Sequence, residues 1–156
     1  IRASADVASK LSVGGNFFSR DQIVGTDSSF RNKAFGVDAQ WSKVGEPGLF
    51  ALAEVLSGER GVAGKPKMLG IQALAAYNIR MTSPTSWLYA IEPSLRFDFA
   101  DADTDVDDNG ATLITGSVAF YMSSRALFRV GYENQSFQAS GAKSISGVRS
   151  SLQVSF

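Results

Sequence analysis

Cysteine and histidine are both missing from the 156 residues of this sequence. Without cysteine the chain has no disulfide bond and no thiolate ligand for a metal ion. Without histidine it has no Ser-His-Asp triad, no Cys-His pair and no histidine-ligated zinc, so the commonest hydrolytic chemistries lose an essential group. We therefore expect a protein that is not an enzyme.

Charge of one sign and long hydrophobic runs are missing as well. Fifteen basic residues balance fifteen acidic ones, which argues against a nucleic-acid partner. No window approaches the roughly 18 consecutive apolar residues of a membrane helix, although 44% of the residues are hydrophobic. The length is that of one domain, which we assign to residues 1–156.

What the sequence does contain is alternation, most clearly over residues 87–99. Because successive side chains of a strand point to opposite faces, this segment has one apolar face and one charged face. Pro93 lies within it and removes a backbone donor, so we expect a bulge or a local irregularity there. The apolar positions are Trp87, Tyr89, Ile91, Pro93, Leu95, Phe97 and Phe99, and the polar positions are Glu92, Ser94, Arg96 and Asp98.

The same pattern predicts eight strands, separated by turn and loop signals. The expected strands are 3–20, 31–44, 49–57, 67–81, 87–99, 111–123, 126–138 and 144–156. Long connections at 21–30, 58–66 and 101–110 alternate with short ones at 45–48, 82–86 and 123–125. This arrangement is typical of bacterial outer-membrane barrels. We therefore predict an all-β fold, an antiparallel transmembrane β-barrel with eight strands in this chain.

In such a barrel the apolar stripes face lipid and the polar stripes face the lumen. Aromatic residues prefer the membrane interface, and those expected there are Trp41, Tyr77, Trp87, Tyr89, Phe128 and Phe156. A soluble lipocalin-like binder would place the apolar face inward instead. A soluble protein with the polar face inward would bury many charges together, at a high cost in free energy without water or complete pairing. The residues expected to line the lumen are Lys10, Arg20, Asp38, Arg80, Glu92, Arg96, Asp98, Arg129, Glu133 and Arg149.

Two segments carry a resemblance to known outer-membrane proteins. Residues 147–156, Gly-Val-Arg-Ser-Ser-Leu-Gln-Val-Ser-Phe, resemble their C-terminal signal, which implies recognition by the outer-membrane assembly machinery. Ile-Glu-Pro-Ser-Leu-Arg at 91–96, followed by Asp-Ala-Asp-Thr-Asp at 101–105 and two further strands, is similar to the C-terminal half of the phosphate-selective porin O/P family.

That resemblance implies a sixteen-stranded, trimeric barrel whose channel carries a ladder of inward arginines. Arg80, Arg96, Arg129 and Arg149 correspond to such a ladder, while Glu92, Asp98 and Glu133 dilute it, so strong phosphate selectivity is not expected.

Two functions follow from two barrel sizes. Sixteen strands leave an aqueous channel, whereas eight strands enclose a lumen that their own side chains fill. We expect a porin-like passive channel for small hydrophilic or anionic solutes in the bacterial outer membrane, in contact with membrane lipid and lipopolysaccharide. The alternative is a small closed eight-stranded barrel with a structural, anchoring or partner-binding role. A homotrimer or another envelope protein is the expected protein partner.

One acidic segment raises the question of a metal ion. Asp101, Asp103, Asp105 and Asp107 alternate in sequence, and hard cations such as calcium bind clustered carboxylates. The spacing meets only half of the EF-hand pattern, because no glutamate stands at the twelfth position. A solvated acidic loop is the preferred interpretation, with calcium as the alternative, and no other cofactor is expected.

Overall fold

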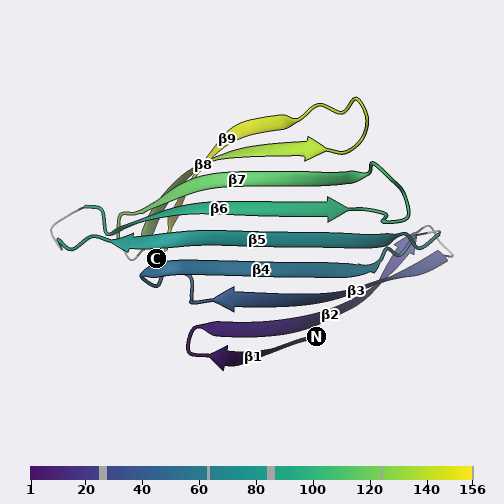
Figure 1. The fold of residues 1–156 in the computed structure, drawn as a ribbon, viewed down its shortest axis with the longest axis horizontal. Coiled ribbons are helices and arrows are strands. Elements are labelled where there is room, and N and C mark those ends of the chain that lie inside the picture. Colours follow the sequence, from purple (N-terminus) through teal and green to yellow (C-terminus); the bar gives the residue numbers. More distant parts are fainter. Residues whose placement is uncertain (25–27, 63, 84–86, 124, 156) are drawn as a thin grey trace.

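The computed structural model describes residues 1–24, 28–62, 64–83, 87–123 and 125–155, and in these residues it contains strands and no helix. One antiparallel sheet runs in sequence order from β1 to β9 (Figure 1). The all-β, antiparallel prediction is confirmed, but the predicted number of eight strands is wrong. The strands are β1 Arg2–Ala8, β2 Leu11–Val24, β3 Ser28–Trp41, β4 Gly48–Glu59, β5 Lys67–Arg80, β6 Ala90–Asp101, β7 Gly110–Tyr121, β8 Ala126–Phe137 and β9 Ile145–Val154.

The additional strand comes from the first predicted segment, 3–20, which is a hairpin. β1 pairs with β2 so that Ala5 lies opposite Val13. Both of these residues have odd numbers, so odd-numbered residues lie on the apolar face in β1 and in β2. The alternation of apolar and polar residues therefore shows no break between the two strands. The turn at Ser9 and Lys10 also contains neither glycine nor proline, the strongest turn signals, and serine is a weaker signal.

Two predicted connections are also different. The expected loop at 21–30 is mostly strand, because β2 continues to Val24 and β3 begins at Ser28; residues 25–27 lie outside the described part of the chain. Conversely, β6 begins at Ala90, so Trp87 and Tyr89 precede it, and the connection between β5 and β6 covers 81–89. The predicted alternation of short and long connections is therefore wrong.

Pro93 produces the expected irregularity, and it is a gap rather than a bulge. Between β5 and β6 the ladder pairs Ala76 with Ser94 and resumes at Ile79 and Ile91 in the same register. On its other side Pro93 pairs with Val118 of β7. The missing proline N–H therefore interrupts only the ladder toward β5.

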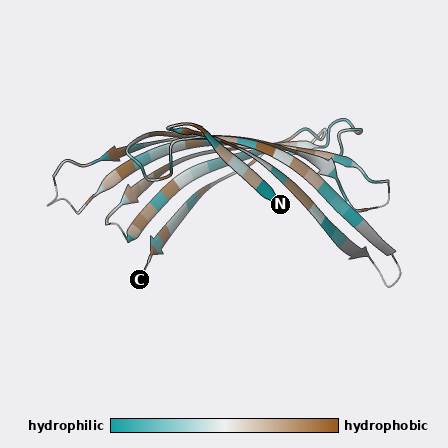
Figure 2. Ribbon diagram, turned by 90° about the horizontal axis from the view of Figure 1, so that it is seen from below, coloured by the Kyte–Doolittle hydropathy of each residue, from teal (hydrophilic) through white to brown (hydrophobic). Residues whose placement is uncertain are grey.

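The sheet is a single curved layer without a conventional core. Figure 2 shows it as an arch. Among the described residues the buried hydrophobic ones are Ala34, Phe50, Ala76, Ala90 and Ala119, and none of the larger side chains is fully buried. In the described part of the chain no ladder joins β1 to β9, so the sheet has two open edges. None of the described residues forms a helix long and apolar enough to span a membrane.

Candidate functional site

The ladders place polar side chains from all nine strands on one surface, which we call the polar face. The register links Asp38 to Glu54, Gln72 to Asp98, and Arg96 to Thr115, so that one face continues from strand to strand. Lys10, expected in the lumen, lies instead in the β1–β2 turn. The other expected lumen residues all lie on the polar face: Arg20, Asp38, Arg80, Glu92, Arg96, Asp98, Arg129, Glu133 and Arg149.

The polar face is the concave side of the arch. A cavity of about 490 Å³ lies against it, and its wall is formed mainly by residues of β4 to β9. The buried hydrophobic residues belong to this face too, because the curvature crowds side chains on the inside of the sheet. The charged members of the cavity wall are Glu92, Arg96, Arg129, Glu133 and Arg149.

In the described part of the chain, three ion pairs distribute opposite charges over the polar face. Arg96 donates three hydrogen bonds to Asp98 on the same strand, the shortest at 2.7 Å. Arg149 of β9 donates to Glu133 of β8 at 2.8 Å. The third pair, Arg2 with Asp38, joins β1 to β3. Such partly exposed pairs fix side-chain positions more than they stabilise the fold.

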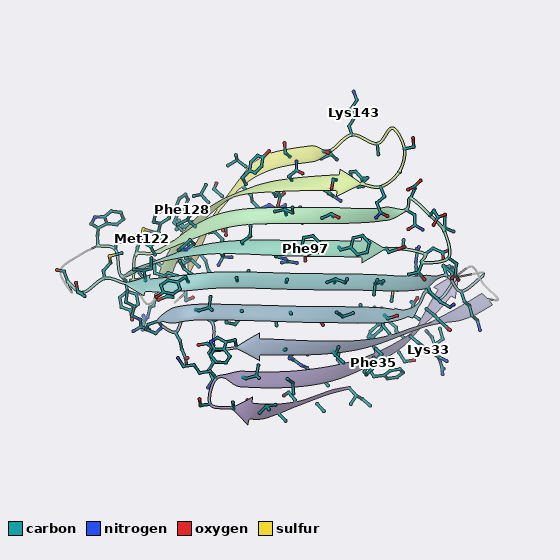
Figure 3. The ribbon with its side chains drawn as sticks, viewed as in Figure 1. Lys33, Phe35, Phe97, Met122, Phe128 and Lys143 are labelled. Carbon is teal, nitrogen blue, oxygen red and sulfur yellow. The ribbon has the colours of Figure 1, made fainter. Side chains whose placement is uncertain are left out.

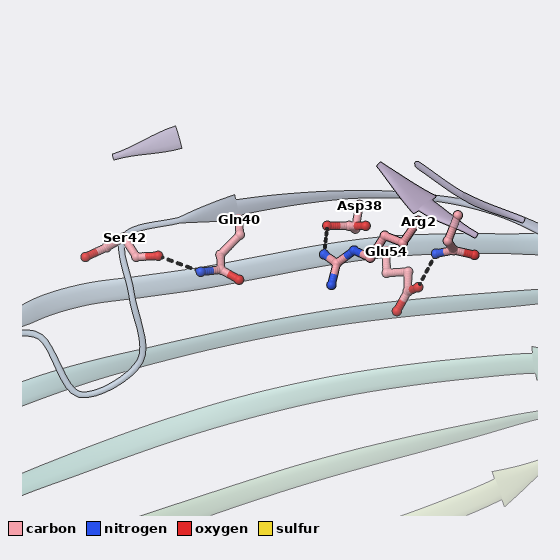
Figure 4. Close-up of polar contacts among 6 residues, drawn as sticks. Arg2, Asp38, Gln40, Ser42 and Glu54 are labelled. Atoms are coloured by element: carbon pink, nitrogen blue, oxygen red, sulfur yellow. Dashed lines mark hydrogen bonds and ion pairs between the residues drawn. The ribbon is translucent and has the colours of Figure 1, made fainter. Parts of the chain in front are cut away.

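The contacts around Asp38 and Glu54 show how two like charges are accommodated. These carboxylates lie directly opposite each other on β3 and β4. Arg2 donates to Asp38 at 2.9 Å, and Asn16 donates to Glu54 at 3.3 Å (Figure 4). Gly14 leaves the space that Asp38 occupies, because a Cβ there would come within 2.7 Å of a carboxylate oxygen.

Glu92 is the most buried charged residue of the polar face, with an exposed fraction of 7%. It accepts hydrogen bonds from Asn78 at 3.0 Å and from the Tyr121 hydroxyl at 3.2 Å. The Asn78 bond bridges β5 and β6 beside the gap that Pro93 leaves in the ladder. A side-chain contact thus replaces missing backbone contacts between these two strands.

Arg129 differs from the other cavity arginines. Within the described residues it forms no hydrogen bond and no ion pair, whereas Arg96 and Arg149 are both paired with carboxylates. It stands in the cavity wall opposite Ala119 on β7 and Ser151 on β9. Among the described residues of the cavity wall, Arg129 therefore presents an unpaired guanidinium to any solute that enters the cavity.

The opposite, convex surface, which we call the apolar face, consists of exposed hydrophobic side chains. Leu95 has an exposed fraction of 59% and Phe35 one of 58%. On β5, residues from Leu69 to Ile79 are uncharged on this face and extend about 33 Å along the strand, or about 25 Å in height at the usual tilt of a barrel strand. Such a continuous exposed apolar surface is typical of a face that contacts another protein or a membrane.

Among the described residues, the charged residues of the apolar face lie at one end of the strands. Lys33, Glu59 and Lys67 form one row across β3, β4 and β5 with alternating sign. Beyond this row Arg31 donates to Asp21 at 2.8 Å, and this hydrogen bond lowers the pKa of Asp21 below its ordinary value. On β3, β4 and β5 the row marks the boundary of the uncharged band on this side.

Aromatic residues mark both ends of the uncharged band. Phe17 lies opposite Phe35 on the apolar face near the charged row. Figure 3 shows Lys33 and Phe35 at one end of the sheet and Phe128 with Met122 at the other. Of the residues expected at the interface, Trp41, Tyr77 and Phe128 lie on the apolar face at the same end, Trp87 and Tyr89 lie just before β6, and Phe156 lies outside the described residues.

The acidic segment forms a loop in which aspartate carboxylates accept hydrogen bonds from backbone N–H groups. Asp101 and Asp103 accept hydrogen bonds from the backbone N–H groups of Asp103 and Asp105, at 2.9 and 3.2 Å. Lys67 lies 3.8 Å from Asp105. Within the described residues no three carboxylates, including Asp107, come together as a cation site. The acidic side chains therefore shape the loop between β6 and β7.

Several polar-face residues were not among the candidates from the sequence. Arg2, Asn16, Glu54 and Asn78 have the parity that places them beside the expected lumen residues. The odd or even number of each residue is enough to predict the face of the sheet on which its side chain lies. Their hydrogen-bond partners depend on the register, which the sequence does not specify.

Comparison of the chain with protein-family models, with curated proteins and with solved structures finds no match.

Proposed function

We propose that this chain forms the wall of a porin-like passive channel in the bacterial outer membrane, which admits small hydrophilic or anionic solutes. The observation that carries the proposal is the separation of the two faces. An uncharged apolar band limited by aromatic residues covers the convex side, and charged residues line a cavity on the concave side. This is the arrangement that a water-filled barrel requires in lipid.

The mechanism needs no catalytic group. Solutes diffuse through water along the polar face, where paired charges keep the wall hydrated and unpaired charges select among ions. Arg129 favours anions, while the paired carboxylates of Asp98 and Glu133 limit that preference. Weak anion preference is therefore the proposed selectivity, in agreement with the resemblance to the phosphate-selective porin O/P family.

The remaining proposed partners follow from the same location. Membrane lipid and lipopolysaccharide would contact the apolar face. The amphipathic strand β9 would carry the signal for the outer-membrane assembly machinery, and a homotrimer or another envelope protein would be the protein partner.

Conductance in planar bilayers tests this proposal. The purified protein should give discrete steps with a modest anion preference. Arg129→Glu should lower the anion-to-cation permeability ratio several-fold, because a unit charge at about 4 Å in water changes the energy of an ion by about 1 kcal/mol. Lys143→Glu is the matched control, since it makes the same charge change in the 138–144 connection.

If the protein inserts into the bilayer but gives no conductance, the proposed channel function is contradicted. Conductance with identical selectivity in Arg129→Glu and Lys143→Glu would contradict the role of Arg129. A protein that stays monodisperse without detergent would favour a soluble binder.

A further inference from the structure

The two open edges of the sheet, β1 and β9, run in the same direction. Every one of the eight ladders is antiparallel and every strand pairs with its neighbours in sequence. The strand direction therefore reverses eight times between β1 and β9. Because eight is an even number, β9 runs in the same direction as β1. Figure 1 shows the arrowhead of β1 pointing to the side of the sheet on which the chain ends after β9.

Both edges are built to be continued. On β9, Val148, Leu152 and Val154 extend the apolar face, while Arg149 extends the polar face as far as the edge. β1 shows the same division, with Ala3 and Ala5 opposite its polar residues. Neither strand contains proline, one of the residues that block an edge. A strand added at either edge could therefore continue both the apolar face and the polar face.

Direct closure of this sheet would require a parallel pair. If β9 paired with β1 of the same chain, the junction would be parallel, in contrast to every other ladder of the sheet. Bacterial single-chain barrels are instead antiparallel with an even number of strands. An unpaired edge is not an alternative within lipid, because its N–H and C=O groups would have no partner.

A second copy of the chain does not solve the problem. Two copies inserted from the same side of the membrane would pair β9 of one with β1 of the other, again in parallel. Antiparallel pairing of β9 with β9 requires a two-fold axis in the membrane plane, which would place equivalent loops on opposite sides of the membrane. Neither arrangement suits a barrel that is inserted in one direction.

We propose that the sheet is completed by a β-segment with an odd number of amphipathic strands, which pairs antiparallel with β9 at one edge and with β1 at the other. This inference rests on the proposed membrane function, and it identifies the partner that the barrel wall needs. An odd number added to nine gives the even number of strands that closes without a parallel pair.

Photo-crosslinking from the edge of β9 tests the inference in the native membrane. Benzoyl-phenylalanine replaces Ser146 or Val154 in separate variants, and the crosslinked peptides are identified by mass spectrometry. We expect both variants to crosslink to one strand outside β1 to β9, with the Val154 variant reaching a residue that precedes the residue reached from Ser146. Ala3, replaced in the same way, should crosslink to the same polypeptide. The control position is Val130 of β8, whose neighbours are Val118 and Ser150.

Crosslinks from β9 to Arg2–Ala8, within one chain or between two copies, would overturn the inference. The same holds for a reversed order of the two crosslinked residues, and for an absence of edge crosslinks when Val130 gives its own. Bilayer conductance separates this inference from the proposed function. If the protein conducts ions and β9 crosslinks to β1, only the proposal of an additional segment with an odd number of strands is refuted. If the edges have antiparallel partners but the protein does not conduct ions, only the proposed channel function is refuted.

Discussion

Glu92 combines a buried position with hydrogen bonds that hold three strands together. Asn78 from β5 and Tyr121 from β7 both donate to its carboxylate. The other amide atom of Asn78, Oδ1, is buried without a hydrogen-bond partner. This cluster lies where Pro93 interrupts the ladder between β5 and β6. Because Asn78 donates to Glu92, removal of the Glu92 carboxylate should leave a buried amide N–H without an acceptor.

Glu92→Ala should therefore lower the free energy of unfolding by about 1–3 kcal/mol, the usual cost of a buried unsatisfied polar group. Glu92→Gln keeps an acceptor for Asn78 and should retain most of the stability. The measurement is urea-induced unfolding in lipid vesicles. The double variant Glu92→Leu/Asn78→Leu removes both partners and should be less destabilised than Glu92→Ala. Equal unfolding midpoints for Glu92→Ala and the original protein would contradict this role.

At the scale of the element, each strand separates a polar face from an apolar face. Leu95 and Thr115 lie on neighbouring strands, β6 and β7, but on opposite faces. Leu95 is exposed on the apolar face, whereas Thr115 lines the cavity. The two positions therefore provide a matched pair for the same substitution.

Leu95→Arg should lower stability in lipid by about 2–4 kcal/mol, the cost of arginine near the middle of a bilayer on the outer face of a barrel. Thr115→Arg should cost much less, because its side chain reaches the cavity. Urea midpoints after folding into vesicles give both values. If Leu95→Arg were no more destabilising than Thr115→Arg, the apolar face would not be in contact with lipid.

The sequence pattern was sufficient for the type of element and for its faces. Period-two alternation identified strands along most of the chain, and it placed residues as distant as Arg20 and Arg149 on one face. It could not reveal the β1–β2 turn, because the pairing of Ala5 with Val13 preserves parity. The end of β2 was also missed, since Asp21 is held by its cross-strand partner Arg31 and not by its own strand propensity.

The contacts within the site depend on information that alternation does not contain. Whether Arg129 or Arg96 has a carboxylate partner follows from the register and from side-chain conformation. The acidic loop shows the same limit. Its alternating aspartates predict an acidic loop with a cation site as the alternative, but they do not predict that backbone N–H groups and Lys67 contact those carboxylates.

At the scale of the whole molecule, the curvature of the sheet gives the two faces different roles. The concave side holds the cavity and the charged residues, and the convex side exposes a continuous apolar band. The central claim is that water covers the first surface and lipid covers the second. The chain has no cysteine of its own, so a single introduced cysteine reports on one position without background.

The most direct test is electron paramagnetic resonance on the protein in lipid vesicles, with a nitroxide attached at Leu95→Cys or at Thr115→Cys. Oxygen concentrates in the bilayer, and a charged nickel chelate stays in water. We predict that the label at residue 95 collides mainly with oxygen and the label at residue 115 mainly with the nickel chelate. Nickel-accessible labels at both positions, or the reverse assignment, would contradict the proposed orientation of the sheet.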